Sequence, residues 1–333
     1  MALRRQKLDL VEGRIARKEK ATPLNEMKDP NFFIVGAPKS GTTSLTTYLL
    51  EHPDVYMPGT WEMNYLAEDL DWVNGPVISS DEEYFSQFED AEGYRRVGEK
   101  SAFYLYSSVA AQRISKISPD VKIVCMLRDP VDLLWSMYRY NVQNLEETIV
   151  PFEEALAAEE DRRKGKLVPG TTTIVQNLYY TKIVDFPEQL GRYFKRFGRG
   201  NVKVIIFGNF ISNTDRVYRD ILSFLDLETR SLDTYEPENS GKERGFYALG
   251  LRRWLLRYPP LKQTADTLIP NWLRDRAAHF WNLLQGGVDR RLKRMNPDLR
   301  RRLSQDLSPM VERLSDVIDK DLSHWCRASK DLA

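Results

Sequence analysis

Residues 36–44, with the sequence GAPKSGTTS, are suited to bind a phosphate group. Small residues let consecutive backbone amides approach phosphate oxygens, and the hydroxyl side chains add donors. Gly36 and Gly41 have the separation of the nucleoside-triphosphate loop G-x-x-x-x-G-K-[ST], but Thr42 stands in place of its lysine. The lysine lies inside the loop, at Lys39, where it would meet a bridging or leaving oxygen near a 5′-phosphate. By itself such a loop is equally consistent with a plain glycine turn.

Arg128 and Ser136 form a second candidate anion site. Arg128 directly follows the apolar run 121–127, and Ser136 comes eight residues after it. A guanidinium is a forked, permanently charged donor, and a serine hydroxyl adds one more hydrogen bond. An isolated arginine at the end of a strand could instead form an ion pair with Asp129 or Asp132.

Taken together, the two motifs resemble those of sulfotransferases that use 3′-phosphoadenosine 5′-phosphosulfate (PAPS). Residues 38–43 are similar to the family's 5′-phosphosulfate loop, and the resemblance implies that Arg128 and Ser136 hold the 3′-phosphate. The order of the segments 52–55, 61–65 and 98–104 is closest to the heparan sulfate or Golgi-type branch and its bacterial relatives. The donor contacts implied in the loop are Lys39, Ser40, Gly41, Thr42, Thr43 and Ser44.

The resemblance also implies the catalytic groups. Glu62 occupies the position of the family's general base, although Trp61 replaces the lysine that precedes it. Lys100 matches the lysine of a Glu-Lys-[Ser/Thr] segment beside the sulfuryl group. Read from the residues alone, Glu62 could be a surface carboxylate, and Lys100 could form an ordinary ion pair with Glu99.

Three further positions bear on the site. No histidine lies between His52 and His279, which favours a carboxylate base over the imidazole of the cytosolic small-molecule branch. Asn64 stands where some relatives have an acceptor-contacting histidine, so the resemblance does not define the acceptor. Residues 293–297 resemble a Lys-Gly-Arg-x-x-Pro segment that closes over the donor. Lys293 and Arg294 are therefore expected donor contacts, although such a charge run is also typical of a solvated helix face.

Strands and helices alternate around these motifs. Apolar, β-rich runs predict buried strands at 31–35, 121–127 and 201–207, and helical spacing predicts the intervening helices. The expected fold is α/β, with a P-loop-like central parallel sheet flanked by helices and a helical, basic C-terminal extension. We expect an N-terminal arm over 1–30 and a single domain over 31–330, with a basic helical lid at 241–300. The predicted helices are 42–51, 131–140, 146–161, 179–197 with a kink or break at Pro187, and 215–225.

Composition narrows the classes of function. The chain has 333 residues, and its 49 Lys and Arg against 48 Asp and Glu argue against a generic nucleic-acid binder. The balance hides a basic segment, residues 242–302, with 15 basic and 5 acidic residues. Two cysteines exclude a disulfide framework, and three scattered histidines argue against a histidine-rich metal site. Without a membrane-spanning run or a signal peptide in the sequence, we expect a cytoplasmic location.

The expected reaction moves a sulfuryl group from PAPS to a hydroxyl or amine of a sugar, lipid or natural-product acceptor. PAP is the product, Glu62 is the base, and no metal is required. One alternative is a P-loop kinase or NTPase, in which Asp129 would bind magnesium. Another is a binding module for a polyanion or a membrane surface, in which residues 242–302 make the contact. These residues also offer the enzyme a peripheral membrane contact.

Overall fold

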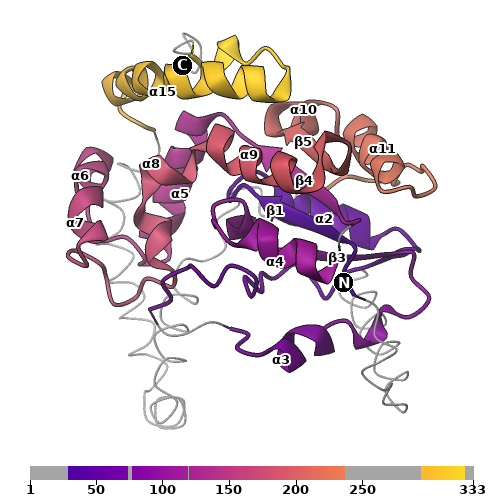
Figure 1. Cartoon of the computed structure of the whole chain (residues 1–333). Coiled ribbons are helices and arrows are strands. Elements are labelled where there is room, and N and C mark those ends of the chain that lie inside the picture. Colours follow the sequence, from indigo (N-terminus) through magenta and orange to yellow (C-terminus); the bar gives the residue numbers. More distant parts are fainter. Residues whose placement is uncertain (1–28, 74–76, 119, 237–293, 327–333) are drawn as a thin grey trace, which may run out of the picture.

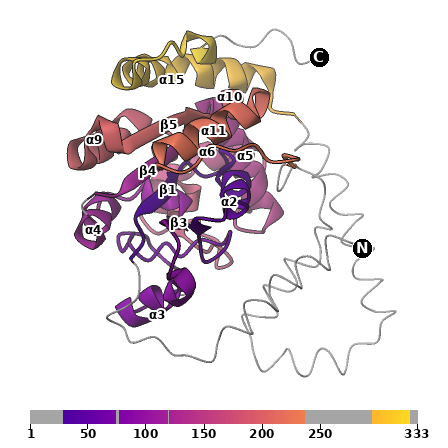
Figure 2. The same ribbon diagram turned by 90° about the vertical axis from the view of Figure 1, so that its right-hand side faces the viewer.

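A parallel sheet of five strands forms the centre of the molecule (Figures 1 and 2). The computed structural model describes residues 29–73, 77–118, 120–236 and 294–326. The central strands are apolar without alternation, because helices cover both of their faces. In the order β2-β3-β1-β4-β5, the strands are β2 (Val55–Tyr56), β3 (Arg96–Lys100), β1 (Phe32–Gly36), β4 (Lys122–Leu127) and β5 (Val202–Ile206).

The register of the sheet determines which residues meet at its carboxyl edge. Ile34 of β1 pairs with Lys100 of β3, and Gly36 pairs with Cys125 of β4. The loop after β1, the end of β3 and the residues after β4 therefore lie at one edge. In an open α/β sheet, ligands bind in the crevice outside the carboxyl ends of the strands.

Helices cover the two faces of the sheet in two hydrophobic clusters. α2, α10 and α11 pack on one face, and α4, α5, α9 and α15 contribute to the other, with α15 lying on α5 and α9. The helices are α2 (Thr42–Leu50), α3 (Asp81–Ser86), α4 (Ala110–Ile117), α5 (Pro130–Gln143), α6 (Phe152–Ala157), α7 (Glu159–Arg163), α8 (Tyr180–Ile183), α9 (Phe186–Phe197), α10 (Phe207–Ser212), α11 (Thr214–Phe224) and α15 (Pro297–Ile318).

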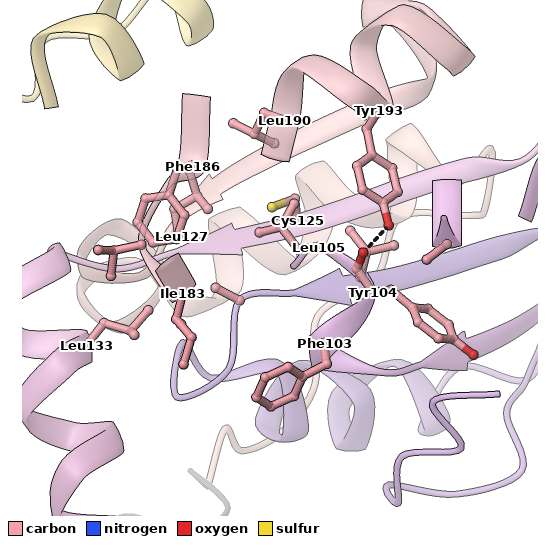
Figure 3. Close-up of a cluster of buried hydrophobic side chains, with 14 of the residues drawn as sticks. Phe103, Tyr104, Leu105, Cys125, Leu127, Leu133, Ile183, Phe186, Leu190 and Tyr193 are labelled. Carbon is pink, nitrogen blue, oxygen red and sulfur yellow. Dashed lines mark hydrogen bonds between the residues drawn. The ribbon is translucent and has the colours of Figure 1, made fainter. Parts of the chain in front are cut away.

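Figure 3 shows part of the second cluster, in which α9 packs over the sheet. The Tyr193 hydroxyl of α9 donates a hydrogen bond of 2.7 Å to the backbone oxygen of Tyr104. Tyr104 ends η3 (Ala102–Tyr104), the short 3₁₀ turn that follows β3. Cys125 is buried in the same cluster, and burial raises the pKa of its thiol. This packing holds the segment beyond β3 against the sheet.

The expected α/β architecture is confirmed, and two of the predicted helices are wrong in detail. Residues 146–161 form an irregular stretch followed by α6 and α7, because the buried Glu146 and Glu147 carboxylates bond to neighbouring polar groups. Residues 179–197 form α8 and α9. The break lies at 184–185, and Pro187 occupies the first turn of α9, where a missing N–H is tolerated.

Several predictions concern parts of the chain that the structure does not describe. Nearly all of the N-terminal arm and of the lid at 241–300 lies outside the described residues. The described C-terminal helix, α15, begins at Pro297, near the end of the expected lid. In the described part of the chain, no helix combines the length and apolarity needed to cross a membrane.

A buried ion pair holds the segment that follows α5. Arg162 of α7 lies 2.7 Å from the Glu147 carboxylate, and both side chains are fully buried. Glu147 also accepts hydrogen bonds from the Tyr180 hydroxyl and from the backbone amide of Ile149. One carboxylate thus joins α7, α8 and the turn after α5.

Arg162→Ala should lower the free energy of unfolding by about 3–5 kcal/mol, because it leaves the Glu147 carboxylate buried without its cation. Urea unfolding followed by circular dichroism measures the loss. The matched control is Arg163→Ala: this neighbouring side chain is 37% exposed and pairs with Glu159, so its loss should cost about 1 kcal/mol or less. Equal losses in the two variants would contradict the assignment.

Candidate active site

The loop between β1 and α2 leaves the first amides of α2 open. Gly41 precedes the helix with a φ of 85°, a left-handed conformation that favours glycine, and it has no side chain to cap the helix. A Cβ at Gly41 would lie 2.8 Å from the ring of Phe207. The amides at a helix start attract anions, and Gly41 keeps this helix start clear of a side chain.

The other loop residues differ in exposure. Ser40, Thr42 and Ser44 are buried, whereas Gly41 and Thr43 are partly exposed. The Ser40 hydroxyl donates to the backbone oxygen of Pro38 at 3.4 Å. All six predicted loop residues thus surround one helix start, where backbone amides, rather than buried hydroxyls, are the main candidate donors.

Lys39 is the cation of this loop. Its backbone has a φ of 61°, and its ammonium lies 4.2 Å from the centre of the Tyr140 ring. The pKa of Lys39 is lowered to about 8, chiefly by burial and also by Arg128 and Arg139, while the Glu62 carboxylate opposes the shift. Lys39 is therefore charged at neutral pH but lies close to its titration point.

Arg128 connects the second motif to this loop. Its Nη1 donates a 3.1 Å hydrogen bond to the backbone oxygen of Lys39, and its guanidinium lies 5.0 Å from the centre of the Phe207 ring. Burial lowers the pKa of Arg128, and Asp132 and Asp129 oppose this shift. Ser136 follows on α5 and is partly exposed.

The two acidic residues near Arg128 have other partners. Asp129 is the N-cap of α5 and accepts hydrogen bonds from the backbone amides of Val131 and Asp132. Asp132 forms an ion pair with Arg300 of α15. The ordinary alternative for Arg128, a strand-end ion pair with either residue, is not among the ion pairs of the described residues.

Glu62 and Lys100 form an ion pair at the end of β3. Lys100 Nζ lies 2.9 Å from Glu62 Oε1, and the backbone amide of Ala102 donates to Glu62 Oε2 at 3.3 Å. The Lys100 side chain is 2% exposed, whereas that of Glu62 is 30% exposed. The alternative pair of Lys100 with its neighbour Glu99 is wrong, because successive side chains of a strand point to opposite faces.

The C-terminal residues predicted to contact the donor are not placed with this group. Lys293 lies outside the described residues. Arg294 is exposed and lines a hollow of about 360 Å³ together with Trp135 and Phe152. The cation that α15 places near Arg128 is Arg300, which lowers the pKa of Arg128.

The sequence interpretation missed Tyr140, Phe207 and Arg300. Tyr140 lies four residues after Ser136 on α5, so helical spacing places both on one face. A larger hollow of about 600 Å³ runs along β5 and is lined by none of the predicted site residues. Among the described residues, no three His, Cys, Asp or Glu side chains are grouped to hold a metal ion.

Comparisons with known proteins fit this geometry. Residues 29–240 match the family described as the sulfotransferase domain. The membrane-associated sulfotransferase kil1 of Dictyostelium discoideum is 30% identical over 141 residues, which are 40% of this chain and 28% of that protein. The bifunctional heparan sulfate N-deacetylase/N-sulfotransferase 4 of Mus musculus is 23% identical over 281 residues, 77% of this chain and 30% of that protein.

A crystal structure of a sulfotransferase from Alicyclobacillus acidocaldarius superposes with a TM-score of 0.65 and 31% identity. The match covers 90% of this chain and 100% of that one. By contrast, the chain matches less than a third of the length of the two curated relatives. Because the family match spans well over half of the sequence, the chain belongs to the PAPS-dependent sulfotransferase family.

Proposed function

We propose that the protein transfers a sulfuryl group from PAPS to a hydroxyl or amine and releases PAP. The observation that carries this proposal is the meeting of three cations and one carboxylate at the carboxyl ends of β1, β3 and β4. Lys39, Arg128 and Lys100 supply positive charge for an anionic donor. Glu62 supplies a proton acceptor within 2.9 Å of one of them.

The donor would bind along the loop and the start of α5. Lys39 and the amides of Gly41, Thr42 and Thr43 would hold the 5′-phosphosulfate, because an uncapped helix start and a nearby ammonium attract the same anion. The guanidinium of Arg128 would take the 3′-phosphate, with the Ser136 hydroxyl as a second donor. These residues fit an anionic donor because the start of α2 is open and because carboxylates only partly neutralise the cations around it.

The chemistry needs one proton acceptor and charge stabilisation. The acceptor oxygen or nitrogen attacks sulfur in line, the bond from sulfur to the phosphate oxygen breaks, and the acceptor proton moves to the Glu62 carboxylate. Negative charge develops on the departing phosphate, where Lys39 and the α2 amides stabilise it. When Lys100 turns from Glu62 to the sulfuryl oxygens, it frees the carboxylate to accept the proton.

A kinase or NTPase is less well supported. Thr42 stands in place of the lysine that such a loop requires, and the Asp129 carboxylate caps α5. Binding of PAP in the presence of EDTA, measured by calorimetry, supports the sulfotransferase. Tight binding of ATP only with magnesium would support the kinase.

The acceptor class is open to a direct screen. One relative's name includes heparan sulfate and another's includes membrane association, so a glycan or a lipid is the first choice among the acceptor classes. Radiolabelled PAPS should be offered with N-desulfated glycans, hydroxylated lipids, phenolic natural products and tyrosine peptides. Label in none of these classes, together with no release of PAP from PAPS, would refute the proposed activity.

Glu62→Gln should lower kcat by about 10²- to 10⁴-fold, because the base is lost while the size of the side chain is kept. Lys39→Ala should abolish turnover, because the ammonium that stabilises the departing phosphate is lost. Arg128→Ala should mainly raise the Kd for PAP, by about ten- to a hundredfold. The control is Glu68→Gln, an exposed carboxylate of the same segment that pairs with Arg113. Near-normal transfer by Glu62→Gln would remove Glu62 from the role of base.

PAP binding should weaken as the pH rises through about 8. The pKa of Lys39 is lowered to about 8, so the ammonium is present below this pH and is lost above it. The Kd for PAP should rise by at most about tenfold per pH unit between pH 8 and 9.5, measured by calorimetry. Lys39→Arg keeps its charge over this range and should flatten the profile. An unchanged slope in that variant would exclude Lys39 as the cause.

We also propose a cytoplasmic location with a peripheral membrane contact through residues 242–302. The full chain should sediment with vesicles that contain anionic lipid, remain in solution with neutral vesicles, and be released by about 0.5 M salt. Replacing Arg252 and Arg253 together by Gln should weaken sedimentation. Binding that is indifferent to lipid charge would contradict the contact.

A further inference from the structure

We propose that Glu99 and Ser101 are positioning residues, which act through the backbone of Asn64 to hold Glu62 where it meets the acceptor. This inference rests on the proposed function, because Glu62 is the base only if sulfuryl transfer is the activity. Glu99 and Ser101 flank Lys100 in the Glu-Lys-[Ser/Thr] segment, but the resemblance implies a role beside the sulfuryl group for Lys100 alone.

Three consecutive residues, Lys100 at the end of β3 and the two that follow it, contact the segment 62–64. Lys100 Nζ and the amide of Ala102 hold the two carboxylate oxygens of Glu62, at 2.9 and 3.3 Å. Between them, the Ser101 hydroxyl oxygen accepts a 2.9 Å hydrogen bond from the backbone amide of Asn64. The Glu62 side chain is thus held directly, and the chain is held again two residues later, at the backbone amide of Asn64.

The backbone contact lies at a sharp turn of the chain. Asn64 has a φ of 51°, in the left-handed region that asparagine enters more readily than most residues other than glycine. The backbone oxygen of Asn64 accepts a 3.1 Å hydrogen bond from the amide of Ala67. Ser101 therefore fixes the start of this turn, and the turn determines the direction from which Glu62 approaches Lys100.

Glu99 determines how Ser101 can bond. The Ser101 hydroxyl donates to Glu99 Oε1 at 2.8 Å, and the Tyr84 hydroxyl donates to Glu99 Oε2 at 2.7 Å. An ionised carboxylate only accepts hydrogen bonds, so when Glu99 is ionised the Ser101 proton points to it and the Ser101 lone pairs remain for the Asn64 amide. A glutamine at this position could donate to Ser101 and reverse that order.

The cost of this arrangement argues that it has a use. Glu99 is 1% exposed and forms no ion pair within the described segments. The pKa of Glu99 is raised to about 7, chiefly by burial and slightly by the Glu62 carboxylate, while hydrogen bonds from Tyr104, Tyr84 and Ser101 oppose the shift. An apolar side chain would avoid this penalty, but it would leave the Ser101 proton without an acceptor.

The test compares Ser101→Ala with Ser107→Ala. Ser107 is an equally buried serine that also follows β3 in the sequence. Its hydroxyl accepts a hydrogen bond from the amide of Ala110 and donates one to Asp69. Hydrogen exchange should accelerate at the Asn64 amide in Ser101→Ala and at the Ala110 amide in Ser107→Ala. Ser101→Thr keeps the hydroxyl and should restore slow exchange at Asn64.

Turnover is then measured as release of PAP from PAPS, with any acceptor labelled in the screen and with water alone. Ser101→Ala should lower kcat by about ten- to a hundredfold, leave the Kd for PAP within about twofold, and be rescued by Ser101→Thr. Glu99→Gln, which keeps the size of the side chain, should show the same split if Ser101→Ala folds poorly. Ser107→Ala should keep its kcat.

The two proposals fail in different ways. If the unmodified protein releases no PAP, the proposed function fails, while the exchange experiment still reports on the hydrogen bond. If the unmodified protein turns over but Ser101→Ala and Glu99→Gln keep kcat, or lose it only together with PAP affinity, the positioning role is wrong. Unchanged exchange at Asn64 in Ser101→Ala would overturn it as well.

Discussion

The ion pair between Lys100 and Glu62 is the contact on which the arrangement of the site depends. Lys100 is the last residue of β3, and the strand fixes its position beside Ile34 of β1. Glu62 belongs to a segment without regular secondary structure, so its position depends on the contact with Lys100, which the sheet holds in place. The same contact holds one oxygen of the Glu62 carboxylate against Lys100, although the Glu62 side chain remains 30% exposed.

Positive charge is concentrated around this pair, and the concentration has a cost. Arg128 and Arg139 both lower the pKa of Lys39, and Arg300 lowers that of Arg128. Aromatic rings lie against two of these cations, Tyr140 against Lys39 and Phe207 against Arg128. Repulsion among these cations favours the binding of a multiply charged anion, because the anion relieves the repulsion.

The sequence predicted the motifs well and the connections between them poorly. The loop, the second motif and the three predicted strands are local patterns, and the structure has them within one or two residues. β3 was not predicted as a strand because its five residues, RVGEK, carry three charges and no apolar period. The partner of Lys100 and the split of the helix at 146–161 depend on contacts with distant residues, which no local pattern contains.

The order of the strands has a consequence for how the site forms. β1 lies between β3 and β4, so the strand that ends in the phosphate loop gains its two neighbours from parts of the chain 64 and 90 residues further on. Each neighbour closes a long parallel crossover, and such contacts form slowly during folding. A nascent chain that ends shortly after Lys100 contains the residues of β1 and β3 but lacks β4 and Arg128. Lys39 and Arg128 of the candidate site, which are 89 residues apart in the sequence, can therefore meet only after β4 has been synthesised.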